Sequence, residues 1–348
     1  MIYLDYQATT PMAPEAFAAM EPWLKDGYWN PHSAHAGGRK AAAAVEVARD
    51  QIAALLPSGG RVIFTSGATE ALNLAIKGCG LPVTALATEH AAVLDCVAHL
   101  GGAVKSVGSD GRAGFDSAGQ GLFAAMLVNN EIGTIQPVAA LAEQCHGQNG
   151  LLLCDAVQAF GRIPIPDGPD MIAVSAHKIH GPKGIGALWI RDGIELTPLM
   201  HGGGQEQGLR SGTLSPALCA GFGVAAQVAA QRMEQDAAHV ASLWDHAIAA
   251  FSDWTVNGST TYRYKGNLNL RRDGVDVGRL MSECRDIAFS AGSACASGSG
   301  RPSHVLSALG LSQTQAKSSI RLGFGRYTTL TEIDIAAQAI NRAAEAML

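Results

Sequence analysis

Residues 171–186 read MIAVSAHKIHGPKGIG and carry the pattern that predicts most about the architecture of this chain. The first four residues are apolar and predict a buried strand. Gly181-Pro182 marks the point where regular structure after this strand stops. Lys178 falls where this strand ends, although burying an unpaired ammonium group is costly. An amine is tolerated there if it forms a Schiff base or if its surroundings deprotonate it. From this segment alone, a solvated lysine between two strands is the simpler interpretation.

The length and composition predict a globular protein with more than one domain. The 348 residues exceed the usual size of a single domain, and 47% of them are hydrophobic while 16% are charged. A net charge of -5 without a local Lys/Arg cluster argues against nucleic-acid binding. No run approaches the ~20 apolar residues of a membrane-spanning helix, and the first residues do not resemble a signal peptide. We therefore expect a cytoplasmic protein that binds neither nucleic acid nor a membrane.

The seven cysteines are dispersed singly along the chain, without a Cys-x-x-Cys pair. An odd and scattered set predicts reduced thiols rather than a disulfide framework. No cysteine combines with histidines at a spacing typical of zinc sites, so we expect no metal site.

Short apolar runs alternate with helical segments in the first half of the chain. Strands are predicted at 61–65, 83–87, 126–128, 151–153 and 171–174, and helices at 41–56 and 68–77. This alternation is typical of an α/β domain with a mostly parallel sheet. Ser215-Pro216 begins one or two long helices that run toward Trp254. Short strand-like pieces and a last helix, which starts at the capping box Thr329-x-x-Glu332, predict a second domain.

Polar groups follow four of the predicted strands, at the sheet edge where ligands bind in open α/β folds. The turn at 65–70, TSGATE, offers backbone N–H groups and a helix dipole to a phosphate, although it is neither a P-loop nor a GxGxxG fingerprint. Asp155 needs a cation such as a protonated heterocycle, unless it is the N-cap of a helix. His90 is either a structural histidine or a ring that stacks on a flat cofactor. Lys178 is the fourth group.

Together these groups describe a site for pyridoxal 5′-phosphate (PLP), with a lysine that anchors the cofactor and an acid that pairs with its ring nitrogen. Lys183 is a second candidate for the anchoring lysine. It follows Gly-Pro in a turn, where an amine normally stays solvated, so Lys178 at the strand end is preferred.

The chain resembles the NifS/IscS-like cysteine desulfurases, which are class V aminotransferases and fold-type I PLP enzymes. The matching segments run from Tyr3 to Arg326 in the order of the family: YLDYQATTP, NPHSAH, FTSGATEALNLAIKG, TEHAAVLD, VNNEIGTIQP, CDAVQ, SAHKIHGPKGIGALW, HGGGQEQGLRSGT, GSACASG and SSIRLGFGR. The resemblance implies an α/β fold with a large PLP-binding domain around a mostly parallel sheet and a smaller α+β C-terminal domain. We expect residues 15–240 to form the large domain and 241–348 the small one, with the segment 1–14 packed against the small domain.

The resemblance implies a set of residues for the cofactor. Lys178 would hold PLP covalently, and Asp155 would pair with its ring nitrogen. Gln158 would contact the oxygen of the PLP ring. His90 would stack on the ring and act as an acid or base. The implied phosphate ligands are Ala68, Thr69, Ser175 and His177, with Thr213 reaching the phosphate of the neighbouring subunit of a homodimer.

The resemblance also implies how the substrate, L-cysteine, is held. Arg321 would bind its carboxylate by a two-pronged salt bridge, with Asn130 as a second ligand. Asn269 would assist, although the segment GNLNL around it matches the family loosely.

Cys295 decides the reaction, because its segment 292–300, GSACASGSG, consists of small residues that do not anchor a core. We expect a loop that moves and a thiol that acts as a nucleophile, whereas packing in a turn or strand suits the other six cysteines better. The resemblance implies that Lys178 takes the Cα proton and that thiolate Cys295 attacks the substrate sulfur. The products would be L-alanine and a persulfide on Cys295, which passes sulfur to a scaffold or carrier protein for iron–sulfur cluster or other biosynthesis. Cys295 would contact an iron–sulfur cluster in transit.

Some features depart from the family or leave alternatives open. The chain ends at Leu348, whereas members that dock the iron–sulfur scaffold have a longer tail, and His32 stands where the family has a small residue. The spacing from Cys295 to Arg321 favours the long-loop group over the SufS-like group. The alternatives are a selenocysteine lyase or another PLP-dependent C–S lyase, an aminotransferase, and a sulfur-carrier or scaffold subunit without catalytic activity.

Overall fold

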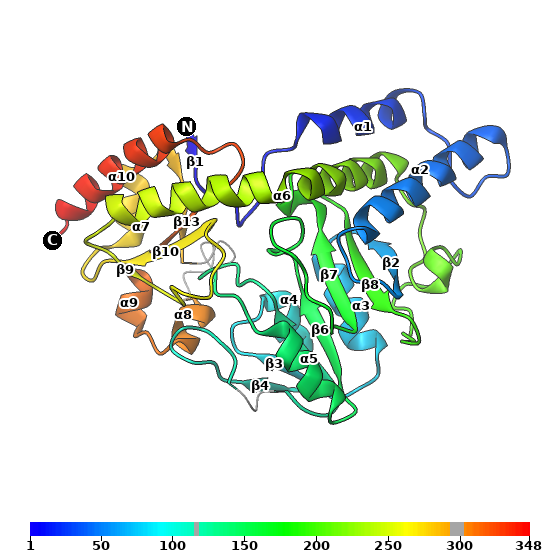
Figure 1. Cartoon of the computed structure of the whole chain (residues 1–348), viewed down its shortest axis with the longest axis horizontal. Coiled ribbons are helices and arrows are strands. Elements are labelled where there is room, and N and C mark those ends of the chain that lie inside the picture. The colour runs from blue at the N-terminus through cyan, green and yellow to red at the C-terminus, as the bar shows by residue number, and fades with distance from the viewer. Residues whose placement is uncertain (115–117, 293–302) are drawn as a thin grey trace.

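The computed structural model describes residues 1–114, 118–292 and 303–348 (Figure 1). Its centre is a seven-stranded sheet in the order β2-β8-β7-β6-β5-β3-β4. All of these strands run parallel except β8, which is antiparallel to both of its neighbours. The bounds are β2 (Gly60–Thr65), β3 (Val83–Leu86), β4 (Ala103–Lys105), β5 (Leu122–Met126), β6 (Leu151–Asp155), β7 (Met171–Ser175) and β8 (Gly186–Arg191).

Helices cover both faces of this sheet because successive strand residues point to opposite sides. Val62 and Phe64 pack in a core with α2 (Ala36–Ala53), α5 (Val138–His146) and the first half of α6 (Pro216–Ala250). Ile63 faces the other core, under α3 (Ala68–Gly78) and α4 (Ala91–His99). A sheet buried on both faces by helices is the α/β architecture that the sequence predicts.

A second unit is built on a four-stranded antiparallel sheet in the order β12-β13-β10-β9. Its own core includes the second half of α6 and the helices α7 (Val277–Glu283) and α10 (Leu330–Glu345). The strands are β9 (Thr255–Val256), β10 (Asn267–Arg271), β12 (Ser290–Ala291) and β13 (Ser319–Gly323); two short helices, α8 (His304–Ala308) and α9 (Gln313–Lys317), lie nearby.

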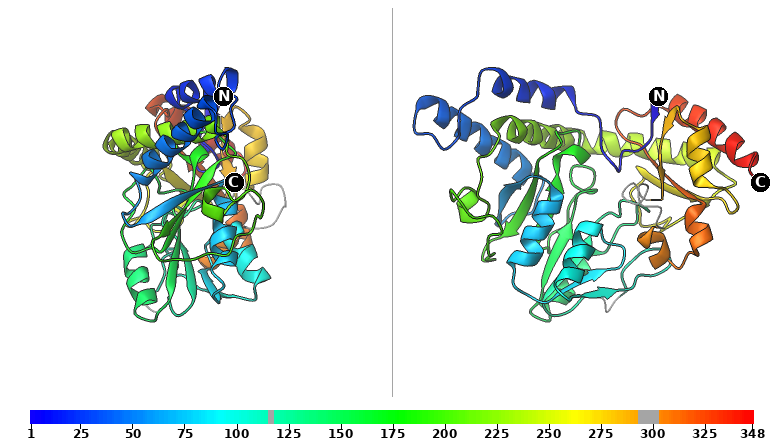
Figure 2. Two further views of the ribbon diagram at one scale, coloured as in Figure 1. Left: turned by 90° about the vertical axis from the view of Figure 1, so that its right-hand side faces the viewer. Right: turned by 180° about the vertical axis from the view of Figure 1, so that it is seen from behind.

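The helix α6 joins the two units, because its 35 residues run along both of them (Figure 2). The helix α1 (Pro14–Lys25) packs on α6. The N-terminus joins the second unit: β1 (Ile2–Tyr3) pairs in parallel with β11 (Ile287–Ala288), and Leu4 is buried in that core. The expected domain boundary at residue 240 lies inside α6, which continues unbroken across it. The expected domain limits therefore stay predictions.

One sequence-based expectation differs from the structure in detail. The strand expected at 126–128 overlaps β5 (Leu122–Met126) only at Met126. The alanines inside β5 have a weak preference for strands and hide it in the sequence. Of the one or two long helices expected after Ser215-Pro216, the structure has one, α6. The last helix starts at the expected capping box, in which Thr329 and Glu332 exchange hydrogen bonds. In the described part of the chain, no helix is long and apolar enough to cross a membrane.

Candidate functional site

A cavity of about 440 Å³ lies beyond the carboxyl ends of the parallel strands. It also reaches β13 of the second unit and the N-terminal segment, through Arg321 and Gln7. The structure brings the following predicted site residues into its lining: Ala68, Thr69, His90, Asn130, Asp155, Gln158, Ser175, His177, Lys178 and Arg321. Parallel strands place their carboxyl ends on one edge, so segments distant in sequence meet there.

Lys178 follows β7 in a short 3₁₀ turn, η1 (Ala176–Lys178), and its side chain is half-buried. Its Nζ donates hydrogen bonds to the carbonyl oxygens of Gln7 and Ala8, the second at 2.8 Å. Lys183 also lines the cavity but is exposed. The amine of Lys178 is therefore held at the site by the N-terminal backbone, which the sequence-based reasoning did not anticipate.

Asp155 ends β6, and its side chain is buried at the edge of the cavity. Its Oδ1 accepts a hydrogen bond of 2.9 Å from the backbone N–H of Val157. A turn rather than a helix follows, so the alternative of a helix N-cap is wrong. Burial raises the pKa of this carboxyl, while the Val157 N–H and the nearby His90 and Lys178 side chains oppose the rise. Such an acid gains from a cation in the cavity, and a protonated ring nitrogen fits this need.

The start of α3 offers a place for an anion. Its N-cap, Gly67, provides no side-chain cap, and Ala68 and Thr69 of the first turn line the cavity. The N–H groups at a helix start have no partner within the helix and suit an anion. The turn is pressed onto β8: a Cβ added at Gly186 would lie 2.7 Å from the carbonyl carbon of Gly67. Glu70 fixes the turn by accepting the N–H of Ser66 at 2.7 Å. The donors present suit a phosphate.

His90 is both a helix cap and a wall of the cavity. Its Nδ1 accepts a hydrogen bond of 3.1 Å from the N–H of Ala92 at the start of α4. The neutral ring therefore carries its proton on Nε2. A fixed tautomer of this kind is what a proton-transfer role requires.

Gln158 and His177 are held by hydrogen bonds within the chain. Gln158 Nε2 donates to the carbonyl of Gln7 at 2.9 Å, and Gln158 Oε1 accepts from Arg162 Nη1 at 2.7 Å. Nδ1 of His177 lies 3.1 Å from the hydroxyl of Thr9. The orientation of both side chains is thus fixed without a ligand.

Arg321 lies on β13 with only 1% of its side chain exposed, yet it borders the cavity. Its Nη1 donates to the carbonyl of Asn130 at 3.2 Å, so two of the predicted carboxylate ligands are in contact. A buried guanidinium beside a cavity is suited to bind a carboxylate.

Three predicted site residues are not brought into the cavity lining. Asn269 lies opposite Arg321 in the register of β10 and β13, but its amide donates to the carbonyl of Glu131 and accepts from Asn257. Thr213 is exposed and lies outside the lining. Cys295 lies outside the described residues. In the described segments, no group of three or more His, Cys, Asp or Glu side chains could hold a metal ion.

Two histidines next to Lys178 couple the stability of the protein to pH. Burial lowers the pKa of His180 to about 4, with a further contribution from Arg326. Burial and Lys178 lower the pKa of His177 to about 4 as well. Unfolding returns both values toward 6.5, so the unfolded chain binds more protons between pH 6.5 and about 4. We expect the contribution of these two histidines to the free energy of unfolding to be constant above pH 6.5. The free energy of unfolding should then fall as the pH drops toward 4.

The measurement is the thermal unfolding midpoint at pH 7 and at pH 5. Between pH 7 and pH 5, the unfolding midpoint of a His180→Asn variant should decrease less than that of the parent, because asparagine does not titrate. Asparagine also tolerates the left-handed backbone of this residue, whose φ is 68°. An equal decrease in parent and variant would contradict the assignment to His180.

The comparisons with known proteins agree on one family. The chain matches the model of aminotransferase class-V over residues 2–335. It is 41% identical over 368 aligned positions to the cysteine desulfurase IscS of Rickettsia prowazekii, and 42% identical to that of Rickettsia bellii; both alignments cover 97% of this chain and 90% of the relative.

Solved structures give the same result. A NifS-like protein from Rickettsia africae has a TM-score of 0.92 at 27% identity, with 99% of each chain covered. SspA in complex with cysteine has a TM-score of 0.83 at 34% identity, with 94% of this chain and 100% of that one covered.

Proposed function

The chain belongs to the class V aminotransferase family, and within it to the PLP-dependent cysteine desulfurases, and we propose that it transfers the sulfur of L-cysteine to Cys295 as a persulfide. The observation that carries the proposal is the single cavity that holds Lys178, Asp155 and Arg321 together. These side chains supply an amine, a buried acid and a carboxylate ligand, which are the three groups that a PLP enzyme acting on an amino acid needs.

The residues around the cavity fit PLP. Lys178 would hold the cofactor covalently, Asp155 would keep its ring nitrogen protonated, and the N-terminus of α3 would bind its phosphate. Gln158 would contact the ring oxygen, with His90 against the ring. When bound, PLP supplies an electron sink that stabilises negative charge at the substrate Cα.

The side chains of this protein then move protons and hold the substrate. Arg321 and Asn130 would fix the cysteine carboxylate, and the amine of Lys178 would take the Cα proton. The thiolate of Cys295 attacks the substrate sulfur, so that an S–S bond forms while the bond between sulfur and Cβ breaks. The carbon fragment keeps the electron pair of that bond and is protonated, with His90 Nε2–H as a donor, to give L-alanine.

The protein would act as a cytoplasmic homodimer that passes sulfur to a scaffold or carrier protein, for iron–sulfur cluster or other biosynthesis. The exposed position of Thr213 supports the dimer, because a residue that reaches the neighbouring subunit's phosphate must lie on the surface of its own. The separate cores support a large domain at 15–240 and a small one at 241–348 that packs with the segment 1–14.

The test is to incubate the purified, PLP-loaded protein with L-cysteine and a thiol reductant and to quantify all products. We expect L-alanine and sulfide in equal amounts, together with a persulfide on Cys295 when the reductant is left out. Pyruvate with ammonia and sulfide would indicate a different C–S lyase, and a thiol keto acid with the amine form of the cofactor would indicate an aminotransferase. Either product set would contradict the proposal.

A further inference from the structure

Arg321 already has a carboxylate partner within the chain. Its Nη2 donates to Asp5 Oδ1 at 2.7 Å and to the hydroxyl of Ser290 at 3.2 Å. Its Nε is buried and has no hydrogen-bond partner in the described part of the chain. The guanidinium expected to receive the substrate carboxylate is therefore paired with an acid, and one of its buried donors is still unused.

The backbone fixes Asp5 in this place. Asp5 forms a parallel bridge with Gly323, and the N–H of Gly323 donates to the carbonyl of Leu4 at 2.8 Å. This short pairing sets the N-terminal segment along β13, two residues from Arg321. The close approach suits a glycine, since a Cβ at Gly323 would lie 2.9 Å from the backbone nitrogen of Tyr6. The pairing therefore fixes the backbone of Asp5 beside β13, within reach of Arg321.

Burial strengthens the electrostatic interaction between Asp5 and Arg321. The side chain of Arg321 is 1% exposed and that of Asp5 is 18% exposed, so water screens this interaction poorly. A buried guanidinium without a counter-ion would destabilise the free protein. Asp5 removes this cost before any substrate arrives, and it also repels a second carboxylate that approaches the same guanidinium.

We propose that Asp5 is a resident counter-ion of Arg321 that lowers the affinity of the cavity for carboxylate-bearing ligands, the substrate L-cysteine among them. This inference rests on the proposed function, in which Arg321 binds the substrate carboxylate. Asp5 is a positioning residue: it acts through Arg321 and does not line the cavity. By balancing the charge of Arg321, it keeps the carboxylate of the substrate, and that of the product L-alanine, from binding too tightly to leave.

An Asp5→Asn variant tests the proposal, because its amide oxygen still accepts the hydrogen bond from Arg321 while the charge is removed. The probe is 3-mercaptopropionate, which has a thiol and a carboxylate but no amino group to react with PLP. We expect isothermal titration of the PLP-loaded protein to show a roughly 10-fold lower Kd in the variant. Cysteamine, which has the amine and the thiol but no carboxylate, should bind parent and variant alike. With L-cysteine as substrate, KM should fall while kcat stays within about 2-fold.

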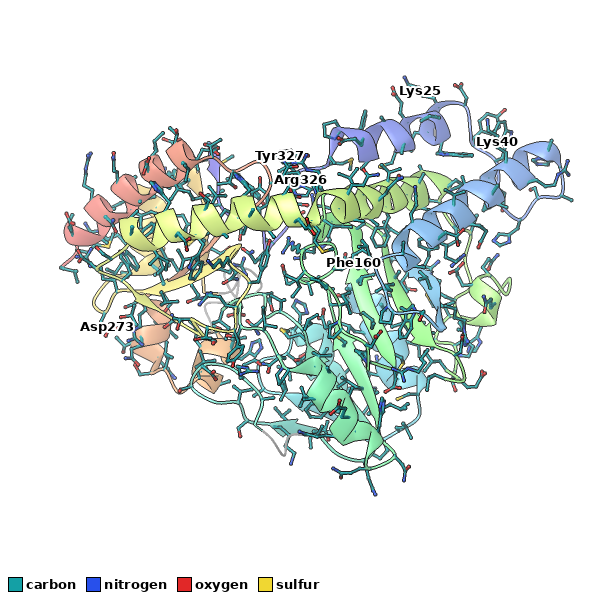
Figure 3. All side chains as sticks on the ribbon, in the orientation of Figure 1. Lys25, Lys40, Phe160, Asp273, Arg326 and Tyr327 are labelled. Carbon is teal, nitrogen blue, oxygen red and sulfur yellow. The ribbon has the colours of Figure 1, made fainter. Side chains whose placement is uncertain are left out.

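A matched control is Asp236→Asn. Asp236 on α6 pairs with Arg326 at 2.8 Å and is 20% exposed, similar to Asp5, but neither residue lines the cavity. Arg326 lies beside the middle of α6 (Figure 3). This variant should leave the Kd of 3-mercaptopropionate unchanged.

An unchanged or higher Kd in Asp5→Asn, in protein that unfolds with the same cooperativity as the parent, would overturn the proposal. An Arg321→Gln variant separates this failure from that of the proposed function. If Arg321→Gln loses 3-mercaptopropionate binding while Asp5→Asn changes nothing, only the inference about Asp5 is wrong. If Arg321→Gln binds the probe as well as the parent does, Arg321 holds no carboxylate, and both ideas fail.

Discussion

A Lys178→Ala variant is expected to lose covalent cofactor attachment and to produce alanine from cysteine at least ~10³-fold more slowly than the parent. The reason is that this one amine both anchors PLP and moves the Cα proton in the proposed reaction. Treatment with borohydride fixes the lysine–cofactor bond, so mass spectrometry should find the added cofactor mass on the parent and not on the variant. Product formation is measured as alanine released per subunit.

The matched control is Lys183→Ala, since Lys183 lines the same cavity but is exposed. This variant should retain the borohydride-fixed cofactor. The assignment of the anchor would be wrong if Lys183→Ala lost the cofactor mass and Lys178→Ala kept it.

A Cys295→Ser variant is expected to bind PLP normally but to release alanine and sulfide at least ~10³-fold more slowly, because a hydroxyl does not accept sulfur as a thiolate does. The six described cysteines do not replace it. Burial raises the pKa of each of their thiols, to about 12 for Cys219 and about 11 for Cys145, so they stay protonated at neutral pH.

The control is Cys79→Ser, because Cys79 is less buried than the other described cysteines. It should keep the parent rate and the persulfide on Cys295, detected by alkylation and mass spectrometry. Alanine and sulfide formation at the parent rate in Cys295→Ser would show that another group accepts the sulfur.

The family, the α/β fold, the dependence on PLP and the desulfurase class could all be predicted from the sequence, and they are confirmed by the family match, the curated relatives and the solved structures. The site could be outlined because its groups follow apolar strands. Asp155 is the last residue of β6, and Lys178 lies three residues beyond the end of β7. Neighbouring parallel strands bring such residues together. The roles of the individual residues stay predictions.

Other parts of the site could not be predicted, for physical reasons. The amine of Lys178 is held by the carbonyls of Gln7 and Ala8, and a backbone carbonyl has no signature in a sequence. Asp5 stands in a segment that matches the family, but its contact with Arg321 depends on a tertiary pairing with β13. Asn269 lies opposite Arg321 in the register of β10 and β13, but the sequence does not indicate that its amide bonds with Asn257 and Glu131.

The pairing of the N-terminal segment with β13 also sets the order of events during protein synthesis. Asp5 is made before its partner Arg321, which follows 316 residues later. At a synthesis rate of ~5–20 residues per second, this is a delay of roughly 15–60 s. Until β11 has been made the first residues have no β-strand to join, and the cavity lacks Arg321 throughout the interval. The nascent chain can fold much of its central sheet, but the pocket is complete only once β13 has been made.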